Sequence, residues 1–246
     1  MIDVSEINAI LVGDSLGMVM LGYENTLAVT VEDMIHHCKA VSRGCTQALL
    51  VCDMPYLSYH VSMTETVRNA GRLIQEGFAE AVKLEGGREF CDEIRLLTRA
   101  SIPVMGHLGL TPQSVHAFGG FKVQGKSVAA AQKLLDDARA IQDAGVFSVV
   151  LEGIPAALGK RITAELEVPT IGIGAGVHCD GQVLVWHDML GMTARQPKFV
   201  KCYATLQPEI EEALKAYDRD VKNSVFPDLQ YSYSVNNEEE MIAQLR

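Results

Sequence analysis

Short apolar runs alternate with amphipathic segments along most of the chain. The apolar runs predict strands at residues 8–14, 47–55, 80–87, 102–110, 147–155, 169–176 and, with a weaker pattern, 182–190. Apolar positions at helical spacing predict helices at residues 31–43, 64–78, 88–100, 127–145, 155–166 and 207–223. Strands this apolar, alternating with helices, are typical of a parallel sheet whose faces are covered.

Capping signals predict where two of these helices begin and end. The segment Thr64–Glu65–Thr66 and Ser127 are plausible helix starts, because hydroxyl and acidic side chains satisfy the free backbone N–H groups of a first turn. Gly77 and Gly145 are plausible helix ends, since glycine adopts the left-handed conformation that often follows a helix.

Polar side chains mark the ends of five consecutive strand candidates: Asp14, Asp53, Glu85, His107 and Glu152. A doubly wound sheet and a (β/α)8 barrel both fit the alternation of elements. Only in the barrel do all strand ends converge on one mouth, where active sites are built. We therefore predict an α/β fold of the (β/α)8 TIM type, with a single catalytic domain at residues 1–225 and a polar tail or arm at 226–246.

Lys83 and Glu85 lie two residues apart in the run AVKLEGG, so both side chains point to the same face of a strand. Burying a charge costs several kcal/mol unless the charge is paired or ligated. In a barrel this face is the interior. We expect Lys83 and Glu85 to point into the barrel axis near its mouth.

The composition excludes several classes of protein. With a formal net charge of -10, the chain is a poor electrostatic match for nucleic acid or an anionic membrane. No apolar run approaches the roughly 18 residues of a transmembrane helix, and MIDVSEIN lacks the features of a signal peptide. The six cysteines show no zinc-like spacing, so we interpret them as reduced core residues of a cytosolic protein.

The segment IGIGAG contains a GxGxG pattern, but a dinucleotide-binding fingerprint should open a helix directly. Here VHCDGQ follows, which is rich in turn residues, and another strand candidate comes after it. A tight loop after a barrel strand is the better interpretation. His36 and His37 lie on a predicted helix and are interpreted as surface or interface residues.

Three of the strand-end residues, Asp14, Asp53 and Glu85, are carboxylates. Their mutual repulsion would raise their pKa values unless a cation lies among them. Oxygen ligands without a convergent His or Cys set favour Mg²⁺ over zinc. Each acid taken singly also fits a helix cap or a strand-end turn.

The remaining candidates suggest acid–base chemistry. Lys83 can bind a carboxylate or stabilise negative charge on oxygen, and it can equally pair with one of the acids. Glu152, in the apolar context VVLEGIP and apart from the metal set, suits a general base, with a hydrogen-bonded structural acid as the alternative. His107 could orient substrate, relay a proton or be structural. A metal, a cation and a separate base suggest enolate chemistry on an α-keto acid, with an electrophile that residue chemistry does not name.

The blocks GDSLG, KLEGG, GHLGLTPQ and GIGAG…DGQ, in order within Ile7–Pro227, resemble ketopantoate hydroxymethyltransferases. The resemblance implies a (β/α)8 barrel that transfers a one-carbon unit from 5,10-methylenetetrahydrofolate to 3-methyl-2-oxobutanoate, giving 2-dehydropantoate on the way to pantothenate and coenzyme A. It implies a cytoplasmic enzyme, often a homodecamer.

The family's functional residues carry over position by position. The Mg²⁺ ligands fall on Asp14, Asp53 and Glu85. The keto-acid contacts fall on Asp14, Ser15, Asp53 and Lys83, and the proton acceptor falls on Glu152.

The chain departs from the family pattern at its start, where only MIDVSE precedes INAILVGD and relatives carry a further strand and helix. We expect a barrel that is open between the 8–14 strand and the final strand, with lowered stability and a tendency to self-associate. Two alternatives to the transferase remain: another Mg²⁺-dependent aldolase or lyase of small keto acids, and a truncated barrel of weak or no activity.

Overall fold

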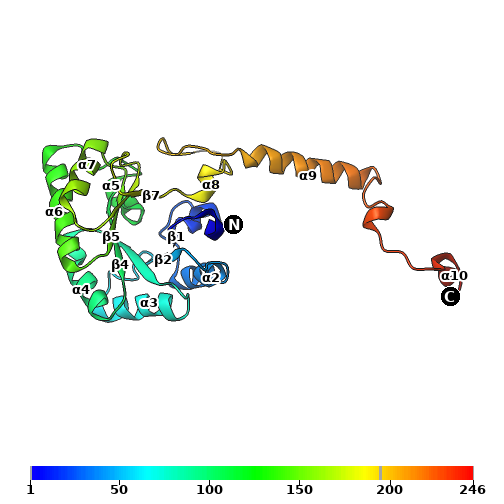
Figure 1. Cartoon of the computed structure of the whole chain (residues 1–246), viewed down its shortest axis with the longest axis horizontal. Coiled ribbons are helices and arrows are strands. Elements are labelled where there is room, and N and C mark those ends of the chain that lie inside the picture. The colour runs from blue at the N-terminus through cyan, green and yellow to red at the C-terminus, as the bar shows by residue number, and fades with distance from the viewer. Residues whose placement is uncertain (1, 194–195, 246) are drawn as a thin grey trace. The chain divides into compact units, whose positions relative to one another are not determined.

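Seven parallel strands form one sheet in the computed structural model, which describes residues 2–193 and 196–245 (Figure 1). Each strand pairs with the next one along the chain, in the order β1 to β7. The strands are β1 (Ala9–Val12), β2 (Leu49–Asp53), β3 (Ala81–Glu85), β4 (Val104–Gly109), β5 (Ser148–Glu152), β6 (Thr170–Ile173) and β7 (Gly181–Gln182).

This sequential order confirms the barrel type of sheet, because a doubly wound sheet reverses its strand order at a switch point. Across the described part of the chain, β1 pairs with β2 alone and β7 pairs with β6 alone. The sheet is therefore open between its first and last strands, as the sequence led us to expect.

Helices follow the strands and cover the outer side of the curled sheet (Figure 1). Successive helices α2, α3, α4, α6 and α7 are in contact with one another in that order. Their bounds are α2 (Val31–Ser42), α3 (Met63–Gln75), α4 (Cys91–Arg99), α6 (Val128–Ala144) and α7 (Ala156–Glu165). Shorter elements are η1 (Ile2–Ser5), α1 (Leu16–Val19), η2 (Arg88–Phe90), η3 (Pro112–Ser114), α5 (Val115–Phe118) and α8 (Trp186–Met189).

The capping predictions are partly confirmed. Ser127 caps α6 by accepting a hydrogen bond from Ala130 N, and Gly145 ends that helix at a φ of 106°. For α3 the predicted start at Thr64–Thr66 is wrong: the cap is Ser62, whose side chain accepts from Glu65 N. The helix begins at Met63, so Thr64 and Thr66 lie inside its first turn.

The predicted strand at 182–190 is also wrong over most of its length. The sheet ends with the two-residue β7, and the last ladder hydrogen bond runs from Val183 N to Gly172 O. The chain then forms α8, in which Met189 N donates to Val185 O. A short apolar run such as VLVW fits a strand and a buried helix equally well, so the pattern alone could not decide.

Two apolar layers hold the sheet. The larger lies between sheet and helices and includes fully buried Leu50, Leu84, Ile94 and Ile141. The smaller fills the inner face of the sheet and consists of Val51, Ala81, Met105 and Val150, with partly buried neighbours. The inner layer is the floor on which the polar residues described below are built.

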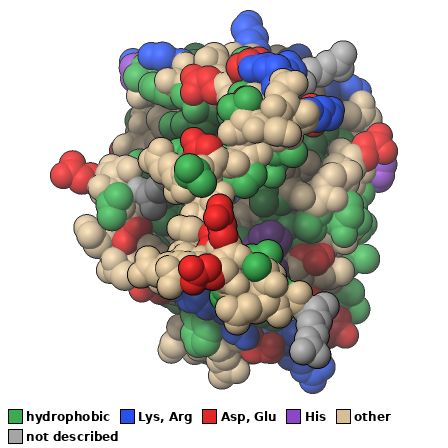
Figure 2. All heavy atoms as spheres, turned by 90° about the vertical axis from the view of Figure 1, so that its right-hand side faces the viewer, with side chains coloured by type: hydrophobic (Ala, Val, Ile, Leu, Met, Phe, Trp, Pro, Cys, Tyr) green, Lys and Arg blue, Asp and Glu red, His purple; other side chains and the backbone are tan. Residues whose placement is uncertain are grey.

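The chain divides into two units, Met1–Leu184 with Pro197–Val200 and Val185–Gln196 with Lys201–Arg246. The second unit contains α9 (Leu206–Lys222), η4 (Leu229–Tyr231) and α10 (Glu238–Ala243), and none of these elements has a buried residue. The face drawn in Figure 2 intersperses acidic, basic and apolar side chains. Among the helices within the described ranges, none is both long and apolar enough to cross a membrane.

All six cysteines are free. Cys38, Cys52, Cys91 and Cys179 are buried, in line with the expected core placement, whereas Cys45 is half-buried and Cys202 is exposed. His36 is exposed on α2 and its ring contacts that of His37 edge to face.

Candidate active site

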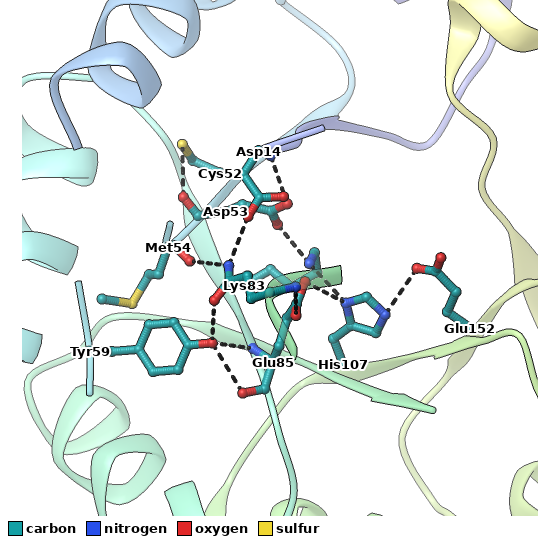
Figure 3. Close-up of polar contacts among 10 residues, drawn as sticks. Asp14, Cys52, Asp53, Met54, Tyr59, Lys83, Glu85, His107 and Glu152 are labelled. Carbon is teal, nitrogen blue, oxygen red and sulfur yellow. Dashed lines mark hydrogen bonds and ion pairs between the residues drawn. The ribbon is translucent and has the colours of Figure 1, made fainter. Parts of the chain in front are cut away.

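A polar layer lies directly above the apolar floor of the inner face. Four of its members stand two residues further along their strands than four floor residues, so the same face carries both layers. The pairs are Val51 and Asp53, Ala81 and Lys83, Met105 and His107, and Val150 and Glu152. The predicted convergence of strand ends is confirmed, because Figure 3 shows side chains of β2, β3, β4 and β5 meeting at one mouth.

Lys83 is at the centre of this layer and is only 3% exposed. Its ammonium lies 2.8 Å from Asp53 Oδ1 and 3.1 Å from His107 Nδ1 (Figure 3). Burial by itself lowers the pKa of Lys83, but the charges of Asp53, Glu85 and Asp14 outweigh it and raise that pKa above its ordinary value. The lysine is therefore charged at any physiological pH. The expectation that Lys83 and Glu85 point inward is confirmed.

His107 connects Lys83 to Glu152. An ammonium can only donate, so His107 Nδ1 must accept from Lys83 and the ring carries its proton on Nε2. That nitrogen lies 3.2 Å from Glu152 Oε2. Burial, reinforced by the Lys83 charge, lowers the pKa of His107, so the ring stays neutral. With one nitrogen occupied and the other protonated, His107 is suited to orienting Glu152 and not to removing a proton itself.

Glu152 was expected to lie apart from the metal set in an apolar setting. Instead the His107 ring alone separates it from Glu85, a member of that set, and its side chain is 14% exposed. The difference arises because β4, which carries His107, lies between β3 and β5. Side chains alternate along each strand, and Glu85, His107 and Glu152 all point to the same face of the sheet. Glu152 thus has the His107 ring within 3.2 Å and has access to the mouth.

Asp14 follows β1 and approaches Asp53, whose Oδ2 accepts a hydrogen bond of 3.1 Å from Asp14 N. Burial raises the pKa of the Asp14 carboxyl to about 7, and the neighbouring Asp53 charge adds to this effect. Burial also raises the pKa of Glu85 well above its ordinary value. The raised pKa values show that the nearby positive charge does not fully stabilise the ionised forms of Asp14 and Glu85.

Ser15 is half-buried beside the same carboxylates. A Cβ built on Gly13 would lie 3.1 Å from Ser15 Oγ and 3.4 Å from Asp53 Oδ2. A side chain at position 13 would therefore crowd both groups. The absence of a side chain there keeps space open next to the predicted keto-acid contacts.

The layer fits a divalent cation. Asp14, Asp53 and Glu85 are each less than 5% exposed, and Lys83 is the only buried Lys or Arg side chain in the described part of the chain. In residues 2–193 and 196–245, no group of three or more His, Cys, Asp or Glu side chains is arranged to hold a metal ion. Mg²⁺ commonly binds through one or two carboxylates and completes its shell with water and substrate. The oxygen donors therefore suit an ion held by part of this set.

Two residues of the site were not singled out from the sequence. Tyr59, 1% exposed, donates a hydrogen bond of 2.8 Å to Gln113 Oε1, and Gln113 Nε2 donates one of 2.8 Å to Asp14 Oδ2. The available signal was their position: both follow a strand that carries a site residue, and Gln113 belongs to the block GHLGLTPQ.

The GIGAG segment behaves as the sequence suggested. It leaves β6 in a series of turns and enters β7 without opening a helix. Gly174 and Gly176 adopt φ values of 66° and 91°, which side chains rarely allow.

Comparison with known proteins gives a family match over most of the chain. The family model described as ketopantoate hydroxymethyltransferase matches residues 1–229. A 3-methyl-2-oxobutanoate hydroxymethyltransferase of Syntrophus aciditrophicus is 58% identical over 234 residues, covering 95% of this chain and 86% of that protein. The enzyme of the same name from Clostridium acetobutylicum is 56% identical over 236 residues, covering 96% and 86%.

Solved structures of lower sequence similarity share the fold. A 2,3-dimethylmalate lyase of the PEP mutase/isocitrate lyase superfamily superposes with a TM-score of 0.55 at 15% identity, covering 98% of this chain and 80% of that chain. An oxaloacetate acetylhydrolase gives a TM-score of 0.55 at 14% identity, covering 96% and 84%. At these identities the likeness concerns the fold alone.

Proposed function

Because this chain belongs to the ketopantoate hydroxymethyltransferase family and is a hydroxymethyltransferase, we propose that it transfers a hydroxymethyl group from 5,10-methylenetetrahydrofolate to 3-methyl-2-oxobutanoate. The product is 2-dehydropantoate, and water supplies the hydroxyl oxygen. The observation that carries the proposal is the buried line Lys83–His107–Glu152, which sets a cation and a carboxylate on opposite sides of a neutral imidazole.

The keto acid would bind at the mouth between β1 and β3, against Asp14, Ser15, Asp53 and Lys83. Carboxylate oxygens drawn from the set Asp14, Asp53 and Glu85 would hold Mg²⁺, which when bound would supply a Lewis acid for the keto oxygen. Lys83 cannot lose its proton in this surrounding, so it offers a fixed positive charge beside the oxygen on which negative charge develops. Exclusion of water by the apolar floor strengthens that interaction.

Glu152 would remove the proton from C3 of the keto acid. Its Oε2 lies 3.2 Å from His107 Nε2, and the other carboxylate oxygen would take the proton. The electron pair of the broken C–H bond moves toward the keto oxygen near Lys83. C3 then attacks the methylene carbon of the folate as one of its two C–N bonds breaks. Water replaces the remaining nitrogen to give the hydroxymethyl group, and the two folate nitrogens take up protons as tetrahydrofolate leaves. A positioned base of this kind accelerates proton transfer roughly 10²–10⁴-fold.

Product formation tests the proposal. Purified protein is mixed with 3-methyl-2-oxobutanoate, and 2-dehydropantoate is measured with and without Mg²⁺ and with and without 5,10-methylenetetrahydrofolate. We expect product only when both are present. Cleavage of keto acids without folate would favour the alternative aldolase or lyase, and a folded protein without any turnover would favour the inactive barrel.

We also propose that the protein acts in the cytoplasm as a homo-oligomer, and specifically as the decamer implied by the family resemblance. Support comes from α9, where Ile210, Leu214 and Tyr217 are exposed at helical spacing. Sedimentation velocity on the full chain tests the assembly. A monomer at micromolar concentration would contradict it.

A further inference from the structure

Gln113 joins the carboxyl ends of three strands, β1, β2 and β3. It lies in η3 after β4 and is 6% exposed. Its side-chain Nε2 donates to Asp14 Oδ2 at 2.8 Å and to Met54 O at 3.0 Å. Its backbone N donates to Glu85 Oε2 at 3.0 Å. One residue therefore holds two of the three carboxylates of the polar layer.

The orientation of the Gln113 amide is determined by its partners. The backbone carbonyl of Met54 can only accept, so the NH₂ group must face Met54, and the same nitrogen then lies 2.8 Å from Asp14 Oδ2. The amide oxygen then faces Tyr59, whose hydroxyl donates to it at 2.8 Å. In the flipped orientation the amide oxygen would face the Met54 carbonyl oxygen, and this hydrogen bond would be lost.

Tyr59 is fixed in turn by Glu85. The backbone N of Glu85 donates to the Tyr59 hydroxyl oxygen at 3.1 Å. The hydroxyl itself lies 2.8 Å from Gln113 Oε1 and 3.1 Å from Glu85 O, so the shorter of its two hydrogen bonds runs to Gln113. The Tyr59 ring packs edge to face against Phe90, with 5.1 Å between ring centroids. Hydrogen bonds therefore link the Glu85 backbone through Tyr59 and Gln113 to the Asp14 side chain.

This arrangement treats Asp14 and Glu85 alike. Gln113 occupies Oδ2 of Asp14 and Oε2 of Glu85, one oxygen of each carboxylate. The other oxygen of Asp14 receives no hydrogen bond from any described residue, and Glu85 Oε1 has only His107 Nδ1 at 3.6 Å, beyond hydrogen-bond distance. Each carboxylate thus keeps one oxygen available for a cation.

We propose that Gln113 and Tyr59 are positioning residues that present Asp14 and Glu85 to the divalent cation, with Tyr59 acting through Gln113. The inference rests on the Mg²⁺ site of the proposed function. Neither residue touches the reacting atoms. Partners that orient metal ligands in this way typically change metal affinity 10- to 100-fold when they are removed.

The test measures Mg²⁺ binding by isothermal titration calorimetry, with no substrate present. We expect Gln113→Met, which keeps length and removes the hydrogen bonds, to weaken Mg²⁺ binding 10- to 100-fold. Tyr59→Phe keeps the ring packing and should weaken binding by a smaller factor. The double variant should bind no more weakly than Gln113→Met alone, because Tyr59 acts through the amide.

Gln132→Met is the matched control. Gln132 is exposed on α6, and its amide nitrogen donates to Asp136 Oδ1. Its Mg²⁺ affinity should equal that of the wild type. If Gln113→Met does not fold, as judged by circular dichroism, Tyr59→Phe carries the test alone.

Unchanged Mg²⁺ affinity in folded Gln113→Met and Tyr59→Phe would overturn the inference, and so would additive losses in the double variant. Activity supplies a second readout: for Tyr59→Phe we expect the Mg²⁺ concentration for half-maximal rate to rise while kcat at saturating Mg²⁺ stays near wild type. A wild type that binds Mg²⁺ without forming 2-dehydropantoate would contradict the proposed function and leave this inference intact.

Discussion

Asp3 and Asp14 are buried to a similar degree, 5% and 3% exposed, yet the pKa values of their carboxyl groups are shifted in opposite directions. Asp3, in η1, accepts hydrogen bonds of 2.8–3.0 Å from Thr46 N, Thr46 Oγ1, Gln47 N and Ala48 N. These bonds, the one from Ala48 first, hold the pKa of Asp3 well below its ordinary value. Burial and the Asp53 charge raise the pKa of Asp14 to about 7.

The difference lies in what surrounds each carboxylate. Asp3 meets backbone donors and fastens the start of the chain to the segment that leads into β2. Asp14 meets another carboxylate and one amide donor, Gln113. A region built for stability supplies donors to its charges, whereas a region built for binding leaves charge uncompensated until a ligand arrives. The following predictions test that distinction, from the largest expected effect to the smallest.

Glu152→Gln keeps the shape of the side chain and removes its ability to accept a proton. Deuterium exchange at C3 of 3-methyl-2-oxobutanoate, followed by NMR in D₂O with Mg²⁺, should fall by roughly 10²-fold or more. The melting temperature should barely change. Glu167→Gln, an exposed glutamate just before β6, is the control. Exchange at the wild-type rate in Glu152→Gln would mean that another group is the base.

Asp14→Asn should stabilise the metal-free protein while abolishing its Mg²⁺-dependent activity. The pKa of Asp14 is about 7 in the folded state and about 3.9 unfolded, so only the folded state binds this proton in between. Its contribution to stability is complete below about pH 4 and is lost as pH rises through about 7, on the order of a few kcal/mol. Urea denaturation in EDTA at pH 5 and pH 8 measures this. Equal pH slopes in both proteins would contradict it.

Asp3→Ala should act with the opposite sign. The folded pKa of Asp3 is lowered, so its contribution to stability is present above about pH 4 and is lost as pH falls through the lowered pKa. We expect the melting temperature at pH 7 to drop by a few degrees and the gap to the wild type to close in acid. Exchange at C3 should be unaffected. If Asp3→Ala lost as much C3 exchange as Glu152→Gln, the proposed difference between the Asp3 and Asp14 regions would be contradicted.

Ser127→Ala removes a cap with one side-chain hydrogen bond, to Ala130 N at 3.2 Å on the surface. The free energy of unfolding should fall by about 1 kcal/mol or less, at all pH values, because no charge is involved. Urea denaturation at pH 5 and pH 8 checks both points. This variant calibrates how much of the Asp3 effect depends on charge and on the number of donors.

Much of the fold followed from local pattern. Six strands could be placed because each apolar run ends in a polar or glycine-rich turn, and Asp53 and Glu85 are themselves the last residues of β2 and β3. The strand at 182–190 failed because its apolar run lacks alternation, and tertiary contacts decided between a strand and α8. Local sequence could not show that β7 would stop at Gln182.

Site residues could be predicted from the sequence only where a charged or ionisable side chain interrupts an apolar strand. Charged residues such as Lys83 stand out in an apolar strand, but Gln113 and Tyr59 are ordinary in a loop. Their roles depend on partners far away in sequence: Gln113 lies 99 residues from Asp14 and 54 from Tyr59. The contact between His107 and Glu152 likewise depends on how β4 and β5 align, which no single segment specifies.

The alternation of floor and polar layer makes the site sensitive to odd and even changes in strand length. An insertion of one residue between Ala81 and Val82 would turn Lys83 and Glu85 toward the helices and bring Val82 and Leu84 to the inner face. An insertion of two residues would restore their direction. No such rule applies to the loops between strands and helices. Over evolutionary time, length variation can therefore accumulate in the connections, while the strands that carry the site tolerate changes only in steps of two.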